Sequence, residues 1–259
     1  MSGPSFSGKT ILVAGGAGYL ALPAVELMAA QGARIVLADI NAERLAAAEA
    51  SALKAGAPEV LALPLDFGDE ESILDCVRAA ASRFGSLWGV VNATFGSTGK
   101  RFDDLTVEEF DRANRLNLTG TFVLAREAAK HMPDGGSMVL FASMYGVVAP
   151  RPATYPPPMA PNPIEYGAGK AGIIQMVRYM AGHFGPRNIR VNAVAPGPFP
   201  HPATQDGSSR FMDNLAGSTM LGRIGRRDEL AGPTAFLLSD ASSYVTGQCL
   251  NIDGGWTAW

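Results

Sequence analysis

Seven short apolar runs alternate along the chain with longer segments of helical period. The runs occupy residues 10–14, 34–38, 59–63, 88–92, 137–142, 189–194 and 249–252. The segments between them, such as 41–55, 69–84 and 106–132, place apolar residues three and four positions apart, as amphipathic helices do. Runs that are apolar throughout, instead of at every second residue, fit parallel strands covered on both sides. The sequence therefore predicts a doubly wound α/β fold with a predominantly parallel, seven-stranded sheet and helices on both faces.

Residues 1–259 are expected to form one domain, since this length suits a single open α/β unit and no linker or repeat divides it. The net charge of −3 leaves no excess of basic residues for nucleic acid or an anionic membrane surface. No apolar run approaches the roughly 20 residues that span a bilayer. Cys76 and Cys249 are expected to be reduced thiols. The first residues lack a secretory signal pattern, so a cytoplasmic location is expected.

A glycine cluster follows the first predicted strand, in "AGGAGYLA". Gly15, Gly16 and Gly18 stand where a strand gives way to a helix, so the backbone can turn tightly and approach a pyrophosphate at the helix N-terminus. Asp39 ends the second strand, where a carboxylate accepts hydrogen bonds from the adenosine ribose and repels a 2′-phosphate. These features predict a Rossmann-type dinucleotide site that prefers NAD to NADP. The alternative for Asp39 is a strand-end cap or turn residue.

Tyr166 and Lys170 are four residues apart in a segment of helical period, so one helix face carries both side chains. A phenol is a poor base at neutral pH, but a nearby ammonium lowers its pKa and creates a group that can transfer protons. Tyr145 and Tyr155 have no basic residue four positions on, so they are expected to line the pocket or to pack in a loop.

Thr106, followed three residues later by Glu109, is a capping box and predicts a helix start.

The order of these motifs resembles the single-domain short-chain dehydrogenases/reductases. Besides the glycine turn and the tyrosine–lysine pair, the similarity rests on segments spread over the chain: "VVNAT", "NLTGTF", "FASMYG", "NAVAPGP" and "IDGGW". It covers essentially the whole chain. The resemblance implies a nicotinamide cofactor, a small-molecule substrate and a homo-oligomer, either a tetramer or a dimer.

The resemblance assigns catalytic roles to Ser143, Tyr166, Lys170 and Asn117. Tyr166 is expected to exchange a proton with the substrate oxygen, and Lys170 to lower its pKa and to hydrogen-bond the nicotinamide ribose. Ser143 is expected to hold and polarise the substrate oxygen. Asn117 is expected to bind, through its backbone carbonyl, a water that links Lys170 to solvent. Two alternatives stay open: Ser143 as a strand-end cap, and Asn114 in place of Asn117.

The resemblance also implies a set of cofactor contacts just after the strands. These are Gly15, Gly18, Tyr19, Leu20, Asp39, Asp66, Phe67, Asn92, Ala93, Tyr166, Lys170, Pro196 and Gly197. Asp66 is expected to face the adenine ring, although it also suits a turn or a helix cap. No residue is assigned to a metal.

Two positions depart from the family pattern. The glycine turn lacks the threonine and the final glycine common in single-domain members, and its spacing is closer to that of the sugar-nucleotide epimerases and dehydratases. Only 62 residues follow Gly197, too few for the substrate domain of that branch. Thr94 replaces a glycine, so the loop there either keeps an ordinary backbone or narrows the cofactor pocket, because β-branched residues tolerate positive φ poorly.

Two segments are expected to shape the substrate site. The first, about residues 144–165, looks like a proline-rich insertion between the catalytic serine and tyrosine, and prolines hold a long loop in shape. We expect a stiff wall over the substrate pocket, with Arg151 either as an anion contact or as a solvated surface residue. The second, about residues 198–221, is a lid in the family and carries His201 and Arg210, two candidates for contact with a polar substrate.

The sequence thus favours an NAD(H)-dependent oxidoreductase that interconverts a secondary alcohol and a ketone by hydride transfer, on a sugar, polyol or hydroxy-acid derivative. The alternative is a catalytically silent protein of the same fold that keeps a dinucleotide as a structural or regulatory ligand. The complete set of catalytic residues favours the enzyme, because a silent protein has no physical need for a proton relay.

Overall fold

The computed structural model describes residues 5–205 and 207–259. Its strands form one sheet in the order β3-β2-β1-β4-β5-β6-β7, and every neighbouring pair is parallel. The strands are β1 (Thr10–Ala14), β2 (Arg34–Asp39), β3 (Val60–Pro64), β4 (Gly89–Asn92), β5 (Gly136–Phe141), β6 (Ile189–Pro196) and β7 (Cys249–Ile252). The predicted seven-stranded parallel sheet is therefore confirmed. Residues 1–4 of the predicted domain and residue 206 of the predicted lid lie outside the described residues.

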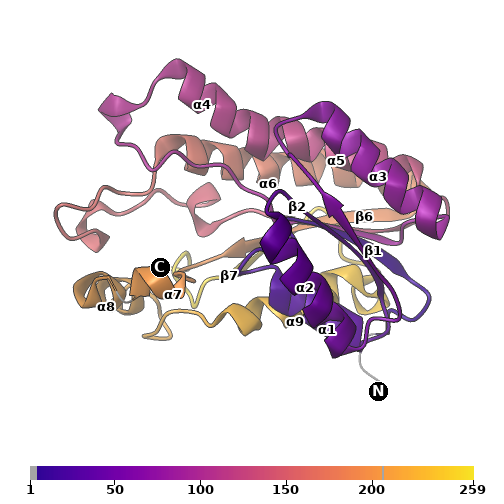
Figure 1. Cartoon of the computed structure of the whole chain (residues 1–259). Helices are drawn as coiled ribbons and strands as arrows, with labels where there is room; N and C mark the ends of the chain where they lie inside the picture. The colour runs from indigo at the N-terminus through magenta and orange to yellow at the C-terminus, as the bar shows by residue number, and fades with distance from the viewer. Residues whose placement is uncertain (1–4, 206) are drawn as a thin grey trace.

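Helices cover both faces of the sheet, as predicted (Figure 1). One face carries α3 (Glu70–Phe84), α5 (Gly120–Lys130) and α6 (Ile164–Phe184), and the other carries α1 (Leu22–Ala30), α2 (Ala42–Ala55) and α9 (Ala231–Leu238). Successive strand residues bury themselves on opposite faces. Leu12 belongs to the core under α3, α5 and α6, whereas Ile11 belongs to the core under α1 and α9. A strand buried on both sides has no solvent-facing positions, which explains runs that are apolar throughout.

The segment predicted as helical from 106 to 132 is two helices joined by a wider turn. The capping box is confirmed at the start of α4 (Val107–Asn114): Thr106 Oγ1 accepts from Glu109 N at 3.3 Å, and Thr106 N donates to Glu109 Oε2 at 3.1 Å. A π-helical turn (Arg115–Thr119) then leads into α5. Such turns insert an extra residue into a helix and re-aim side chains, and they are frequent at functional sites.

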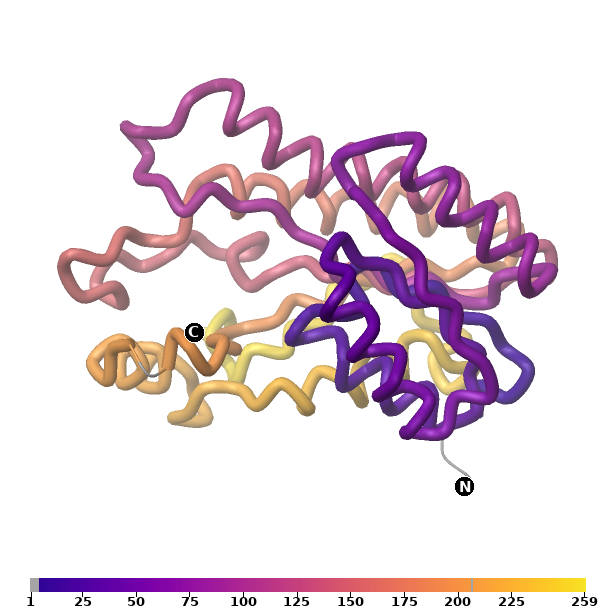
Figure 2. The backbone as a smooth tube through the Cα atoms, in the orientation of Figure 1, coloured from indigo at the N-terminus to yellow at the C-terminus, as the bar shows by residue number. Residues whose placement is uncertain are grey.

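Two further segments project from the same end of the molecule, beyond the carboxyl ends of the strands (Figure 2). The proline-rich segment contains only two short 3₁₀ turns, Met144–Gly146 and Pro152–Thr154. The other segment contains α7 (Pro202–Gln205) and α8 (Ser209–Gly217). Within the part of the chain that the structure describes, no helix is long and apolar enough to cross a membrane.

Candidate active site

The glycine turn between β1 and α1 leaves backbone donors free. Gly15 has a φ of +71°, and a Cβ there would lie 3.0 Å from the backbone of Ala93 and Thr94, so no side chain fits. Among the described residues, the N–H groups of Tyr19 and Leu20 have no acceptor, and no side chain caps α1. A helix N-terminus with free donors suits a pyrophosphate. The turn therefore fits a dinucleotide, despite its missing threonine and final glycine.

Asp39 and Arg44 lie together at the end of β2. Asp39 is buried, and its Oδ1 accepts a hydrogen bond from Asn41 N at 3.0 Å, so it does act as a turn residue. Its Oδ2 makes no hydrogen bond to the described residues and can serve the adenosine ribose. Arg44, which the sequence analysis missed, has its Nη2 3.9 Å from Asp39 Oδ1. Arg44 lines the cleft that also holds the predicted catalytic residues, whereas Asp39 lies behind it and is not part of the lining. An acidic residue suits the ribose hydroxyls of NAD, whereas a nearby arginine suits the 2′-phosphate of NADP.

A cleft of about 500 Å³ joins this turn to the predicted catalytic residues. Predicted residues from both groups line it: Gly15, Gly18, Tyr19, Leu20, Ala93, Ser143, Tyr166, Lys170, Pro196 and Gly197. Gly197 is needed for packing as well, because a Cβ there would lie 2.4 Å from Asp253 Cα in the "IDGGW" segment. The cleft follows the carboxyl ends of β1, β4, β5 and β6, where ligands bind in open α/β sheets.

Lys170 lies one turn of α6 beyond Tyr166, as predicted, and is only 2% exposed. Its Nζ donates to the Phe141 carbonyl at 2.7 Å and to the Thr94 carbonyl at 3.4 Å. The same Nζ lies 5.6 Å from the centroid of the Tyr166 ring. Burial disfavours the charged ammonium and lowers the pKa of Lys170 to about 7.

The prediction that Lys170 lowers the pKa of Tyr166 is wrong for this structure. Burial of the ring raises the pKa of Tyr166, and the hydrogen bond with Ser143 offsets only part of that effect. Among the described residues Lys170 donates to backbone carbonyls, and no hydrogen bond joins it to the phenol. Tyr166 is therefore protonated at neutral pH, which suits a proton donor to a carbonyl oxygen.

Ser143 caps the turn after β5 and also lines the cleft. Its Oγ accepts a hydrogen bond from Tyr145 N at 3.1 Å, so it caps the 3₁₀ turn after β5. The same side chain lines the cleft beside Tyr166, where its polar contact lowers the pKa of the phenol. Because the cap uses only the oxygen, the hydroxyl proton remains available to a ligand.

Asn117 lies in the π-helical turn and is buried behind the cleft wall. Its side chain accepts from Gly96 N at 3.1 Å and donates to Gly96 O at 2.8 Å, and its carbonyl accepts from Thr121 Oγ1 at 2.6 Å. Asn114 instead donates back to Phe110 O at 3.1 Å within α4, so its side chain serves its own helix. A carbonyl oxygen can accept a second hydrogen bond, so the predicted role of the Asn117 carbonyl stays a prediction.

Asn92 shapes the turn after β4 instead of lining the cleft. Its Nδ2 donates to Thr121 Oγ1 at 2.8 Å, and its Oδ1 accepts from the backbone N–H and the hydroxyl of Thr94 at 3.1 and 2.7 Å. Thr94 keeps an ordinary backbone, since Asn188 is the only non-glycine residue with positive φ among those described. The threonine thus replaces the usual glycine without strain, and Ala93 is the residue that reaches the cleft.

Asp66 and Phe67 do not line the cleft in this structure. Asp66 is exposed, and its Oδ1 accepts from Gly68 N at 2.9 Å, which is the turn role considered as its alternative. Phe67 is buried in the core against α5, where a Cβ on Gly120 would lie 2.5 Å from the Phe67 ring. The Phe67 side chain points into the sheet–helix core, which leaves only its backbone for a cofactor, and the predicted contact stays a prediction.

Glu165 is a positioning residue that the sequence analysis missed. It is fully buried, and its Oε1 accepts from both the backbone N–H and the hydroxyl of Thr98 at 2.9 Å. These bonds tie the loop after β4 to the first turn of α6. The same loop places the Phe95 ring edge-on to Tyr166, with centroids 6.4 Å apart. Only a contact between distant parts of the chain reveals this role.

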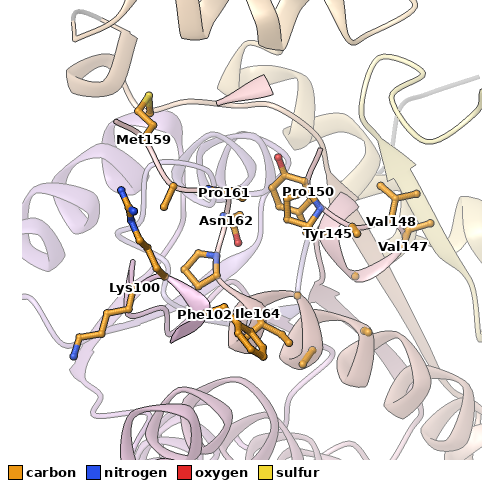
Figure 3. A pocket seen from close by; sticks show the side chains of 18 of the residues that line it. Lys100, Phe102, Tyr145, Val147, Val148, Pro150, Met159, Pro161, Asn162 and Ile164 are labelled. Carbon is orange, nitrogen blue, oxygen red and sulfur yellow. The ribbon is translucent and has the colours of Figure 1, made fainter. Parts of the chain in front are cut away.

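The two projecting segments both contribute to the cleft. Tyr155 and Asn162 come from the proline-rich segment, and Phe211 and Leu215 come from α8. On its other side the proline-rich segment borders a second hollow of about 860 Å³, which shares Tyr145 and Asn162 with the cleft. Figure 3 shows this outer hollow, with Met159, Pro161, Phe102 and Ile164 around it.

Of the three polar residues proposed for substrate contact, only His201 lines the cleft. Its ring lies edge-on to Tyr19, with centroids 4.9 Å apart, so the residue just before α7 contacts the glycine turn. Arg151 and Arg210 are exposed and are absent from the cleft lining. The structure thus agrees with a solvated Arg151.

Comparisons with known proteins extend this description. The family model described as enoyl-(acyl carrier protein) reductase matches residues 17–257. The 2,5-dichloro-2,5-cyclohexadiene-1,4-diol dehydrogenase of Sphingobium indicum is 35% identical over 97% of this chain and 98% of its own. The cis-4-hydroxycyclohexanecarboxylate dehydrogenase of Sinomonas cyclohexanicum is 33% identical over 99% of both chains. The structure of an NAD⁺-bound xylitol dehydrogenase superposes with a TM-score of 0.87 at 31% identity, over 96% of this chain and 99% of that one.

The fold, the cleft and these relatives define an oxidoreductase that acts on CH–OH groups. More particularly, the chain belongs to the short-chain dehydrogenase/reductase family, because the family model spans most of its length and the relatives match it end to end. The predicted resemblance is confirmed.

Proposed function

We propose that this protein is an NAD(H)-dependent oxidoreductase that interconverts a secondary alcohol and a ketone. One observation carries the proposal: Ser143 and Tyr166 share a cleft with a glycine turn whose backbone donors are free. A protein that only stored a dinucleotide would have no use for a half-buried phenol and a buried serine at the other end of the same cleft.

A nicotinamide dinucleotide, when bound, supplies the hydride donor or acceptor. The N–H groups of Tyr19 and Leu20 would hold its pyrophosphate, and Asp39 its adenosine ribose. Ser143 donates its hydroxyl proton to the substrate oxygen and so fixes the orientation of the substrate. In the reducing direction Tyr166 gives its phenolic proton to the carbonyl oxygen. In the oxidising direction the protonated phenol must first release that proton by way of Lys170, and its oxygen then takes the proton of the hydroxyl.

Lys170 has two parts in this proposal. Its Nζ would hydrogen-bond the nicotinamide ribose, as the family resemblance implies. Because its pKa is about 7, it gains and loses a proton readily near neutral pH. That property suits a proton relay from Tyr166 to solvent. In this relay the proton would pass by way of Lys170 to a water held by the Asn117 carbonyl.

The names of two relatives point to a substrate class that the sequence did not suggest, a carbon-ring alcohol. Both curated relatives are named for a six-membered carbon ring that bears a hydroxyl group. The cleft agrees with such a ring, because Phe95, Met144, Phe199 and Phe211 give it apolar walls. A sugar, with a hydroxyl on most carbons, would leave many of those groups without partners.

The proposal is tested by incubating the protein with cyclic secondary alcohols, sugars and hydroxy acids, each with NAD and with NADP, and recording the absorbance of the reduced nucleotide. We expect turnover with NAD and a cyclic secondary alcohol. Tight nucleotide binding by calorimetry without turnover of any substrate would support the catalytically silent alternative instead.

Replacing Asp39 by Ser is expected to move the nucleotide preference from NAD toward NADP. The serine can still accept from Asn41 N, but it loses the charge-assisted bonds to the ribose and the repulsion of a 2′-phosphate, while Arg44 remains. The ratio of kcat/KM for NAD to that for NADP should fall by about 100-fold. Adding Arg44→Ala should remove the gained NADP activity. An unchanged ratio in Asp39→Ser would contradict the assigned role of Asp39.

We also propose a cytoplasmic homo-oligomer, a tetramer or a dimer, as family resemblance implies. Phe122 on α5 and Tyr179 on α6 are exposed apolar side chains that such contacts could cover, as is Trp259 near the end of the chain. Trp256, by contrast, is 1% exposed and packs with Tyr145 and Phe211, so it belongs to the core.

A further inference from the structure

Two tyrosines form a hydrogen-bonded pair on the wall of the cleft. Tyr145 lies two residues after Ser143, in the first 3₁₀ turn, and Tyr155 lies in the proline-rich segment. Their phenolic oxygens are 2.5 Å apart. Both side chains line the cleft that also holds Ser143 and Tyr166. The pair therefore faces the place where a substrate would lie.

One O–H donor of the tyrosine pair is left over after the two phenols have bonded to each other. Each phenol carries one O–H donor, and the bond between them uses one of the two, whichever way it points. Among the described residues, neither phenolic oxygen donates to any further acceptor. A buried donor without an acceptor is unfavourable, so the second proton is available to an acceptor on a ligand.

The pair is held in place by its surroundings. Tyr145 is 9% exposed, and the Tyr155 ring packs on Phe211 of α8 with centroids 5.4 Å apart. Asn214 of the same helix donates to the Thr154 carbonyl at 3.0 Å. Burial raises the pKa of both tyrosines, so both stay neutral over the working pH range. A fixed neutral donor discriminates between ligands better than a mobile one, because little entropy is lost when it is used.

The rest of the lining restricts what the pair can meet. The charged residues among those that line the cleft are Arg44, which lies beside Asp39 at the nucleotide end, and Lys170, which is beside Tyr166. Near the pair the walls are Met144, Phe211 and Leu215, which are apolar, and Asn162, which is polar but neutral. A charged group on the substrate would be desolvated there without a counter-ion, whereas a hydroxyl or carbonyl oxygen needs only one donor.

We propose that the Tyr145–Tyr155 pair binds a second, neutral oxygen of the substrate, so that the protein prefers cyclic diols or hydroxyketones to simple cyclic alcohols. This inference rests on the proposed function. Ser143 and Tyr166 take the reacting oxygen, and the pair takes the other oxygen across an apolar ring. The proline-rich segment thus contributes a specificity-determining residue, Tyr155.

The test compares cyclohexane-1,4-diol with cyclohexanol in steady-state oxidation by the full-length protein. In the wild type kcat/KM should be at least about 10-fold higher for the diol, the value of one good hydrogen bond. The double variant Tyr145→Phe/Tyr155→Phe should lose that preference, mainly through a raised KM for the diol. Its kcat/KM for cyclohexanol should stay within about threefold of wild type. At least one single variant should lose the preference too, and it identifies the phenol that faces the substrate.

Tyr244→Phe is the matched control, since Tyr244 is fully exposed and its hydroxyl should not affect selectivity. Nucleotide affinity should be unchanged in the single variants, whereas the melting temperature should fall by about 2–4 °C, because each variant breaks the hydrogen bond between the two phenols. Equal losses for diol and cyclohexanol, or a wild type without preference for the diol, would overturn the inference while leaving the proposed function intact. If the double variant does not fold, the two single variants decide, and retention of the preference in both overturns it. A wild type that oxidises no alcohol at all would overturn the proposed function, and this inference with it.

Discussion

Replacing Tyr166 by Phe is expected to lower kcat for alcohol oxidation by about 10³-fold, within the range attributed to positioned proton-transfer groups. The change removes only the phenolic oxygen, so the ring keeps its packing against Phe95. Nucleotide affinity should therefore stay within about threefold of wild type, because the bonds of the glycine turn and Asp39 are untouched. Single-turnover kinetics and nucleotide titration by protein fluorescence measure the two quantities separately.

Tyr244→Phe is the matched control for this variant. It makes the same chemical change at a fully exposed side chain outside the cleft. Its kcat should equal that of the wild type. Oxidation that survives in Tyr166→Phe at more than about a tenth of the wild-type rate would mean that another group moves the proton. The assignment of the catalytic tyrosine would then fail.

The sheet and the catalytic helix could be predicted because their signals are local. Each strand is a run of adjacent residues, and Tyr166 and Lys170 are one turn apart on one helix, so spacing alone places them together. The glycine turn is local in the same way. These elements depend little on what the rest of the chain does.

The roles of Glu165 and Tyr155 depend on contacts between distant residues, which spacing does not report. Glu165 is bonded to Thr98, 67 positions away, and Tyr155 packs on Phe211. The direction of the Phe67 side chain depends on packing as well. Neighbouring residues after a strand point to opposite sides, and only the packed structure shows that the Phe67 side chain lies in the core.

The pKa of Tyr166 could not be inferred from its distance to Lys170 along the helix. The direction of the shift depends on burial of the phenol and on where the ammonium points. In the structure the ring is buried, and Lys170 Nζ donates to the carbonyls of Phe141 and Thr94. The same burial acts on both residues, raising the pKa of the acid and lowering that of the base. The neutral phenol is therefore favoured at neutral pH, whereas Lys170, with a pKa of about 7, exchanges its proton readily there.

Replacing Lys170 by Met is expected to stabilise the fold while reducing activity to about 1% of wild type or less. The side chain is fully enclosed, and its pKa falls from 10.5 in water to about 7, so the folded state disfavours the charge. Methionine fills a similar volume without a charge, at the cost of the hydrogen bond to the Phe141 carbonyl. After subtracting that bond, we expect a gain of about 2–4 kcal/mol in the free energy of unfolding at pH 7.

The pH dependence identifies the cause of this gain. Between pH 7 and 10.5 the unfolded chain holds a proton on Lys170 that the folded chain has lost, so wild-type stability rises with pH through this window. The advantage of Lys170→Met should be largest at and below pH 7 and should shrink as pH approaches 10.5. Denaturant unfolding at several pH values measures it, with the exposed Lys54→Met as a control that should show neither the gain nor the pH dependence. A gain that stays constant with pH, or a loss of stability at pH 7, would mean that folding does not disfavour the charge on Lys170. The proposed proton relay through Lys170, which depends on a pKa of about 7, would then have to be abandoned.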